Sequence, residues 1–215
     1  MKYKIKQYQL LKKKILIGTG NEGKFKEFKF YIEYFKIFKH FKILDLSSQD
    51  IRGEPNENGD TFESNASSKS SFYFKKTKIP TLSDDSGFII KNSIDFPGVK
   101  TARFTIEQGG IKKAVNHIYK KYGLECNAIP ATFFCSLNYL DKDNEISANG
   151  MVEGKIIKNK RGHNGFGFDP FFVPKGHKKT FAEMEKIEKL ILSHRYFAFL
   201  DFKKKISQIL LDNLL

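Results

Sequence analysis

The chain has 215 residues, of which 40% are hydrophobic and 14% aromatic, and its formal net charge at pH 7 is +14. This length and composition predict a folded protein with room for a real core, and they exclude an intrinsically disordered chain. No apolar stretch approaches the roughly 18 residues of a membrane span. The two cysteines, Cys126 and Cys135, lack metal-ligand spacing and do not suggest a disulfide framework, so we expect a cytoplasmic protein.

The excess of positive charge raises the question of a nucleic-acid partner. Only four of the 38 basic residues are arginines, namely Arg52, Arg103, Arg161 and Arg195. Proteins that read nucleic acids favour arginine forks, and an AT-rich genome would by itself enrich lysine. We therefore expect neither nucleic acid nor a membrane as partner, although a non-catalytic basic protein that binds nucleic acid stays as an alternative hypothesis.

The first predicted elements are a buried strand at residues 14–18, a Gly-rich turn and a helix. Apolar residues recur at helical spacing at Phe25, Phe28, Ile32, Phe35 and Phe38. A strand, Gly-rich turn and helix in this order aim backbone N–H groups at an anion, usually phosphate. The spacing imitates a P-loop, but Phe25 stands where that loop needs Ser or Thr. We expect a phosphate-binding turn with Lys24 as countercharge, with an ordinary strand-to-helix connection as the alternative.

A second strand is predicted at residues 42–46, followed by a polar loop at residues 47–60. Asp60-Thr61-Phe62-Glu63 resembles a capping box and predicts a helix that runs to about Lys76. Asn65 and Lys69 are four residues apart and should share one face of this helix.

An acidic stretch, Ser83-Asp84-Asp85-Ser86-Gly87, lies between two apolar runs at residues 79–82 and 88–90. Carboxylates at the end of a buried strand are costly unless a divalent metal or a cationic ligand compensates for the lost water. The Ser-Gly pair predicts a tight turn, because glycine tolerates positive φ. A solvated acidic turn is the alternative.

The second half of the chain predicts a Pro-Gly turn at residues 97–98, a helix at 110–122, and a hairpin of strands at 131–139 and 145–157. A second capping box spans residues 180–183, and an amphipathic helix runs to about Leu211. Between the hairpin and this capping box, three glycines within residues 162–167 predict a loop that approaches a ligand closely. Phe166 and Phe168 offer flat faces to a base there, and the alternative is a turn with core aromatics.

Eight short motifs stand in the order found in the inosine/xanthosine triphosphate pyrophosphatases, a family that the chain resembles from about Lys14 to Leu210. The motifs are Thr19-Gly20-Asn21 with Lys24; Thr61-Phe62 with Asn65-Ala66 and Lys69; Ser83 to Gly87; Pro97-Gly98 with Ala102-Arg103; Phe133 to Cys135; Gly165 to Pro170; Ala182-Glu183-Met184; and Ser193-His194-Arg195.

The resemblance implies an elongated, two-lobed α/β fold with a long central mixed sheet flanked by helices and a substrate cleft between the lobes. It also implies Mg²⁺-dependent hydrolysis of non-standard purine nucleoside triphosphates (ITP, dITP and XTP) to the monophosphate and pyrophosphate, usually by a homodimer. Residues 1–13 are expected to form a basic leader before a single domain at residues 14–215. A Maf-like pyrophosphatase acting on other modified nucleotides is the alternative enzyme.

The resemblance also implies roles for individual residues. Asp85 would be general base and metal ligand, Asp84 its catalytic support, and Glu57 a second metal ligand. The triphosphate would be held by Thr19, Gly20, Asn21, Glu22, Gly23, Lys24, Lys69 and Ser86. Phe166 would stack on the base, and the other substrate-binding positions would be Arg103, Gly167, Phe168, Asp169, Lys189, His194 and Arg195.

Three residues depart from the family's usual pattern. Lys100 stands where Tyr is common, Phe168 where Tyr or Trp is frequent, and Leu190 where Asn is usual. These departures bear on substrate range and packing more than on the chemistry. The sequence leaves open the preferred purine, the preferred sugar and the means of rejecting GTP.

Overall fold

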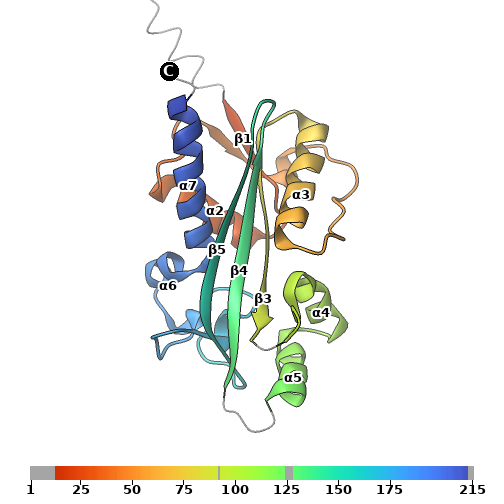
Figure 1. Cartoon of the computed structure of the whole chain (residues 1–215), viewed down its shortest axis with the longest axis vertical. Coiled ribbons are helices and arrows are strands. Elements are labelled where there is room, and N and C mark those ends of the chain that lie inside the picture. Colours follow the sequence, from red (N-terminus) through yellow and green to blue (C-terminus); the bar gives the residue numbers. More distant parts are fainter. Residues whose placement is uncertain (1–12, 92, 124–127, 213–215) are drawn as a thin grey trace, which may run out of the picture. The chain divides into compact units, whose positions relative to one another are not determined.

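The computed structural model describes residues 13–91, 93–123 and 128–212, and its centre is a six-stranded mixed sheet (Figure 1). The strand order is β2-β1-β3-β4-β5-β6. The strands are β1 (Lys14–Ile17), β2 (Lys42–Leu44), β3 (Thr81–Ile90), β4 (Ala128–Leu140), β5 (Glu145–Ile157) and β6 (Phe172–Pro174). Strand β1 pairs in parallel with β2 and β3, whereas β5 and β6 are antiparallel. The predicted α/β fold with a mixed sheet is therefore confirmed.

The chain divides into two compact units that share the long strands. The first comprises residues up to Asp85 together with 136–149 and the chain from Phe199, and the second comprises 86–135 and 150–198. Strand β3 passes from the first unit to the second between Asp85 and Ser86. The boundary of a single domain at residue 14 stays a prediction, and the leader lies outside the described residues except for Lys13.

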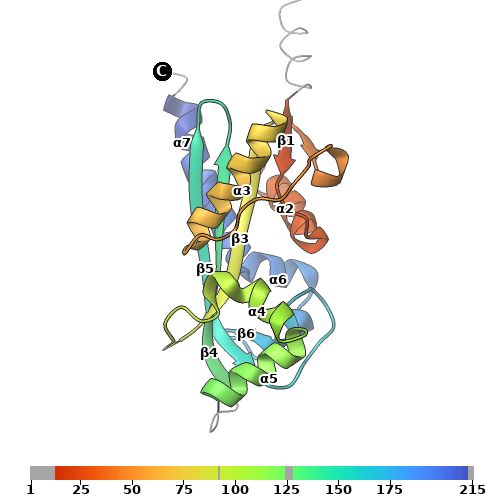
Figure 2. The ribbon, with the colours of Figure 1, turned by 90° about the vertical axis from the view of Figure 1, so that its right-hand side faces the viewer.

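In the first unit, helices α2 (Glu22–Tyr34) and α3 (Phe62–Thr77) cover opposite faces of the parallel strands (Figure 2). The strand order β2-β1-β3 explains this, because the two right-handed crossovers run in opposite directions along the sheet. Helix α7 (His194–Asp212) adds Phe199, whose ring lies 5.1 Å from that of Phe28 and 5.0 Å from that of Tyr31. Aromatic packing between α2 and α7 therefore forms much of this core.

Three predicted element bounds in the first unit were wrong. Helix α2 ends at Tyr34, short of Phe38, because Lys36 and Phe38 adopt positive φ angles of 55° and 52°, which no α-helix continues. The second strand ends at residue 44 and is followed by a 3₁₀ turn, Leu46–Ser48. The capping box lies one residue later than predicted, with Thr61 as N-cap and Ser64 as its reciprocal partner.

The second unit packs helices around an aromatic core. Its helices are α4 (Thr101–Glu107), α5 (Ile111–Tyr122) and α6 (Lys186–Leu192), with 3₁₀ turns at Gly98–Lys100, Asp169–Phe171 and Phe181–Glu183. The rings of Phe133 and Phe172 meet edge-on at 4.4 Å within a buried cluster. The predicted second capping box and the predicted bounds of β5 are confirmed. Among the described residues, no helix is long and apolar enough to span a membrane.

The predicted tight turn at Gly87 is wrong, because β3 runs straight through it to Ile90 and its φ is not positive. The glycine serves a close approach instead. A Cβ atom at this position would lie 2.4 Å from Thr101 Oγ1 and 2.6 Å from the carbonyl oxygen of Gly98. The missing side chain therefore lets the start of α4 press against the strand.

Gly87→Ala is expected to destabilise the protein by about 1–3 kcal/mol, because the added methyl group overpacks this contact. The matched control is Gly20→Ala, where a Cβ would meet nothing within 4 Å and φ is not positive. We expect the control to stay within about 0.5 kcal/mol of wild type. Urea unfolding followed by circular dichroism measures both, and equal midpoints for the two variants would contradict the packing role.

Candidate active site

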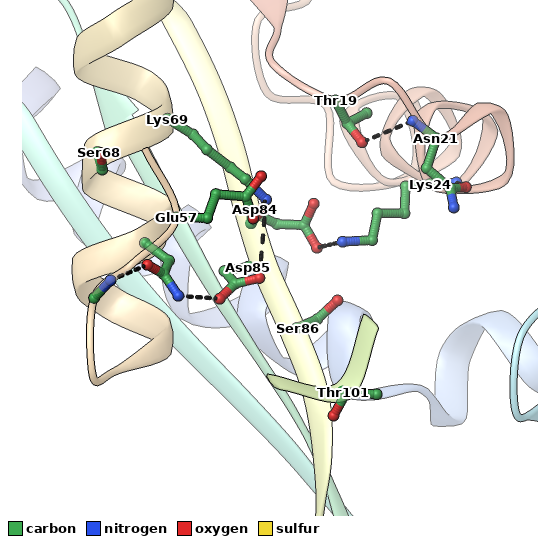
Figure 3. Close-up of polar contacts among 12 residues, drawn as sticks. Thr19, Asn21, Lys24, Glu57, Ser68, Lys69, Asp84, Asp85, Ser86 and Thr101 are labelled. Atoms are coloured by element: carbon green, nitrogen blue, oxygen red, sulfur yellow. Dashed lines mark hydrogen bonds and ion pairs between the residues drawn. The ribbon is translucent and has the colours of Figure 1, made fainter. Parts of the chain in front are cut away.

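Two consecutive buried carboxylates, Asp84 and Asp85, lie near the middle of β3 (Figure 3). Successive side chains of a strand point to opposite faces of the sheet. The Asp84 carboxylate accordingly meets Lys24 of α2, and the Asp85 carboxylate meets Asn65 of α3. Each carboxylate therefore has its own side-chain partners, while the charges of Lys24 and Asp84 still act on Asp85.

Helix α3 holds Asp85 with two side chains, Asn65 and Lys69, which share one helical face as predicted. The amide nitrogen Nδ2 of Asn65 donates to Asp85 Oδ2 at 3.0 Å, and Lys69 Nζ lies 3.8 Å from Oδ1. The amide oxygen of Asn65 accepts from the Gly59 N–H at 2.9 Å, so both ends of the amide are held. Asn65 was not among the predicted site residues, although its four-residue spacing from Lys69 was the signal for it.

The Lys69 ammonium group joins three acidic residues of the first unit. Its Nζ lies 2.7 Å from Glu57 Oε2 and 3.2 Å from the backbone oxygen of Asp84, besides its contact with Asp85. Burial alone would lower the pKa of Lys69, but the nearby charges of Asp84, Asp85 and Glu57 outweigh burial and raise this pKa. Lys69 is therefore a cation at neutral pH.

Asp85 has the properties of a base. Burial raises its pKa above the ordinary value, Lys69 and the Asn65 hydrogen bond partly offset the rise, and Asp84 adds to it. A carboxylate with a raised pKa binds a proton more readily, while the neighbouring ammonium group keeps it ionisable. Carboxyl groups with shifted pKa values cluster at functional sites, so Asp85 is the strongest candidate for catalysis in the first unit.

On the other face, Asp84 forms a buried ion pair with Lys24 in the first turn of α2. Asp84 Oδ2 lies 3.0 Å from Lys24 Nζ, and the Asp84 side chain is fully buried. Asn21 caps the helix by accepting from the Lys24 N–H at 3.0 Å, and Thr19 Oγ1 accepts from the Asn21 N–H. The predicted turn thus places Lys24 beside a helix N-terminus, the end of the dipole that favours anions.

The other predicted residues of this turn contribute mainly backbone. The Glu22 side chain pairs with the exposed Lys26 at 2.7 Å, so its carboxylate belongs to the helix surface. Gly20 is exposed, and Gly23 belongs to α2. A phosphate-binding role for these three residues would therefore use N–H groups.

The second unit brings together five of the predicted residues around the half-buried ring of Phe166. Lys189 Nζ lies 4.9 Å from the centre of this ring, and the guanidinium carbon of Arg195 lies 5.8 Å from it. Asp169 Oδ2 accepts from the Phe166 N–H at 2.8 Å and lies 3.1 Å from Lys189 Nζ. Arg195 donates to Ser86 Oγ at 3.1 Å. We call these five residues the aromatic–cation cluster.

One of the two phenylalanines of the Gly-rich loop, Phe168, departs from the prediction that both offer a face to a base. Phe168 is buried in the core, with its ring edge-on to Phe88 at 4.5 Å, so it is not available to stack on a base. Gly165 and Gly167 adopt φ angles of 75° and 61°, and these left-handed residues turn the chain on both sides of Phe166. For Phe168 the alternative of a core aromatic is correct.

Four further residues lie outside the two groups described above: two predicted binding residues, and two residues that depart from the family's usual pattern. His194 is buried with its ring stacked on Phe133 at 4.9 Å, and Arg103 is exposed on α4. Leu190 is buried within α6, which explains an apolar residue there, and Lys100 is exposed just before α4. These contacts give His194 a packing role besides any role in binding.

The mixed α/β sheet and the buried Asp85 carboxylate indicate an α/β enzyme, and the N-terminus of α2 with Lys24 favours an anionic, phosphorylated substrate. The comparison with known proteins narrows this class. The chain belongs to the Ham1 family, whose sequence profile matches residues 15–205.

Relatives in the family share about a third of the sequence. A dITP/XTP pyrophosphatase of Aquifex aeolicus is 38% identical over 190 residues, covering 85% of this chain and 91% of the relative. A dITP/XTP pyrophosphatase of Bacillus subtilis is 34% identical over 203 residues, covering 94% and 98%. The solved structure of the Staphylococcus aureus Ham1 protein superposes with a TM-score of 0.77 at 29% identity, covering 91% of this chain and 99% of that one.

Lys24→Met is expected to destabilise the protein by about 3–5 kcal/mol at neutral pH, because it removes the ammonium group from a fully buried carboxylate. The double variant Lys24→Met/Asp84→Asn should recover most of this loss, since the buried charge is then gone. Urea unfolding measures the cycle.

The matched control for this cycle is Lys26→Met on the same helix, whose partner Glu22 is exposed. We expect it to change the free energy of unfolding by less than about 1 kcal/mol. A Lys24→Met variant as stable as Lys26→Met would show that the buried pair contributes nothing.

Proposed function

We propose that this protein hydrolyses the non-standard purine nucleoside triphosphates ITP, dITP and XTP to the nucleoside monophosphate and pyrophosphate, and so removes them from the nucleotide pool. The observation that carries the proposal is the buried Asp85 carboxylate held between Asn65 and Lys69. Membership of the Ham1 family and two relatives named dITP/XTP pyrophosphatase support the choice of substrate.

The acidic residues of the first unit suit Mg²⁺ as cofactor. Among the described residues, no three His, Cys, Asp or Glu side chains form a group that would hold a metal by themselves. Mg²⁺ does not need such a group, because it commonly binds one or two carboxylates and completes its shell with phosphate oxygens and water. Asp85 and Glu57, which share the Lys69 ammonium group, are the carboxylates that would hold it. When bound, Mg²⁺ neutralises phosphate charge and lowers the pKa of water.

Asp85 acts as general base in the proposed reaction. It takes a proton from a water molecule as the water oxygen forms a bond to the α-phosphorus, and the bond from that phosphorus to the bridging oxygen breaks. Pyrophosphate leaves with the bridging oxygen and its electron pair. Asn65 keeps the Asp85 carboxylate in one orientation, and Lys69 and Lys24 supply fixed positive charge for the phosphates.

The aromatic–cation cluster is the proposed reader of the base. Phe166 provides a ring on which a purine can stack, and Lys189 and Arg195 are cations that can donate to an acceptor. Hypoxanthine and xanthine carry an acceptor at the 6-position, whereas adenine carries an amino donor. A buried donor left without an acceptor rejects the wrong base strongly.

We also propose Mg²⁺ as the physiological ion, a homodimer as the working form and the cytoplasm as the compartment. The family resemblance supports the first two, and the location of the nucleotide pool supports the third. Sedimentation of the purified protein at the mass of a monomer would contradict the dimer.

Asp85→Asn is expected to lower the turnover of ITP by at least about 100-fold, because asparagine cannot accept the proton. A coupled pyrophosphate assay with Mg²⁺ measures it. The matched control is Asp143→Asn, an exposed carboxylate in the β4–β5 turn, which should keep wild-type turnover. Orthophosphate as the first product would contradict the reaction, and better hydrolysis of modified pyrimidine triphosphates than of ITP or XTP would favour the Maf-like alternative.

The same substitution is expected to stabilise the metal-free protein at neutral pH. A raised carboxyl pKa means that the folded state binds the proton more tightly than the unfolded state, so the free energy of unfolding falls as pH rises from 3.8 through the raised pKa. Asparagine removes this loss and still accepts from Asn65. We expect a higher urea midpoint for the variant at about pH 7, and a smaller difference at about pH 4. A lower midpoint at neutral pH would contradict the sign of the shift.

A further inference from the structure

A polar network joins α3 to the β4–β5 hairpin at a distance from the catalytic carboxylate. The side chain of Asn138 on β4 is fully buried; its oxygen accepts from Ser70 Oγ, and its Nδ2 donates to Glu145 Oε1 at 2.9 Å and to Ser147 Oγ at 3.0 Å. Ser67 Oγ donates to the same Glu145 oxygen at 2.7 Å. Two hydroxyl groups of α3 are therefore bound to one amide and one carboxylate of the hairpin.

The helical periodicity places this network on the flank of α3 opposite to Asn65 and Lys69. With 3.6 residues per turn, Asn65 and Lys69 lie on one flank of the buried stripe of α3, and Ser67 and Ser70 lie toward the other flank. The large apolar or aromatic side chains buried on α3 are Phe62 and Tyr73, and the buried residues between them are Asn65, Ala66 and Ser70. Apolar packing is non-directional, and so small a central stripe leaves the rotation of the helix about its axis weakly fixed. Directional hydrogen bonds on the far flank supply what the stripe lacks.

We propose that Asn138 is a positioning residue for the reaction: through Ser70, Glu145 and Ser67 it fixes the rotation of α3 that sets Asn65 and Lys69 against Asp85. The inference rests on the proposed function, in which Asp85 is the base. A rotated helix would move the Asn65 amide and the Lys69 ammonium group together. A displacement of about 1 Å at a catalytic group can cost about 100-fold in rate.

The first test exchanges donor and acceptor within the network. Asn138→Asp keeps the acceptor for Ser70 but puts a second carboxylate against Glu145, so we expect kcat for ITP to fall at least about 10-fold, with a smaller change in KM. Adding Glu145→Gln restores the donor–acceptor match with the same number of charges, and we expect kcat to return to within about threefold of wild type. A single variant with wild-type kcat, or a double variant without recovery, would overturn the proposal.

The second test does not depend on activity. The Lys69 side chain is 13% exposed, whereas Lys75 and Lys76 on the same helix are exposed. Acetylation with acetic anhydride, read by mass spectrometry, should label Lys69 weakly in wild type, at least threefold more in Asn138→Asp relative to these two lysines, and weakly again in the double variant. Unchanged labelling of Lys69 would overturn the proposal. A wild-type protein that releases no pyrophosphate from ITP would contradict the proposed function and leave this measurement intact.

Tyr139→Phe is the matched control, because it removes a hydrogen bond of 2.7 Å to Asp141 from the same strand without touching α3. We expect it to lower the midpoint of unfolding and to leave both kcat and the labelling of Lys69 unchanged. If Asn138→Asp does not fold, Ser67→Ala/Ser70→Ala removes the helix side of the network and should give the same fall in kcat and the same rise in labelling. A loss of stability alone in that variant would overturn the positioning role.

Discussion

The Lys69 ammonium group is the interaction on which the proposed catalytic site depends. It is largely buried, which by itself is costly, and it is kept charged by two carboxylates and a backbone oxygen. Removing the Lys69 ammonium group would leave the Glu57 and Asp85 carboxylates without this shared countercharge. The loop that carries Glu57, the helix that carries Lys69 and the strand that carries Asp85 are therefore electrostatically coupled.

The alternation of side chains along β3 gives the two carboxylates different contacts and therefore different roles. Asp84 forms an ion pair with Lys24 at the start of α2, and its side chain is fully buried. This arrangement suits a structural role in holding the turn that carries Lys24. Burial raises the pKa of Asp85, and its partners, an amide and a more distant ammonium group, offset this rise only in part. Neighbouring carboxylates of one strand thus have different partners, and Asp85, whose pKa is raised, is the one suited to act as a base.

Much of this arrangement could be predicted from the sequence, because local patterns encode it. The period of apolar residues, the two capping boxes and the four-residue spacing of Asn65 and Lys69 all depend on neighbours along the chain. The predictions for Gly87 and Phe168 were wrong for a different reason. Nothing local shows that Gly87 serves contact with Thr101, 14 positions further along the chain, or that Phe168 turns into the core while Phe166 does not. Such outcomes depend on packing partners distant in sequence, which periodicity does not identify.

The weak apolar stripe of α3 and its polar tether can be understood together. A broad apolar face would hold a helix firmly against the sheet. Packing alone nevertheless tolerates small rotations of the helix about its axis, because apolar contacts have no preferred direction. Helix α3 must direct the amide of Asn65 and the ammonium group of Lys69 at one carboxylate. Its rotation about its own axis therefore has to be fixed more closely than its distance from the sheet. The buried hydrogen bond from Ser70 and the exposed one from Ser67 provide that directional constraint at the flank away from Asp85, where they leave the catalytic face unobstructed. Two serines within α3, Ser67 and Ser70, are poor helix formers by propensity, and this requirement accounts for them.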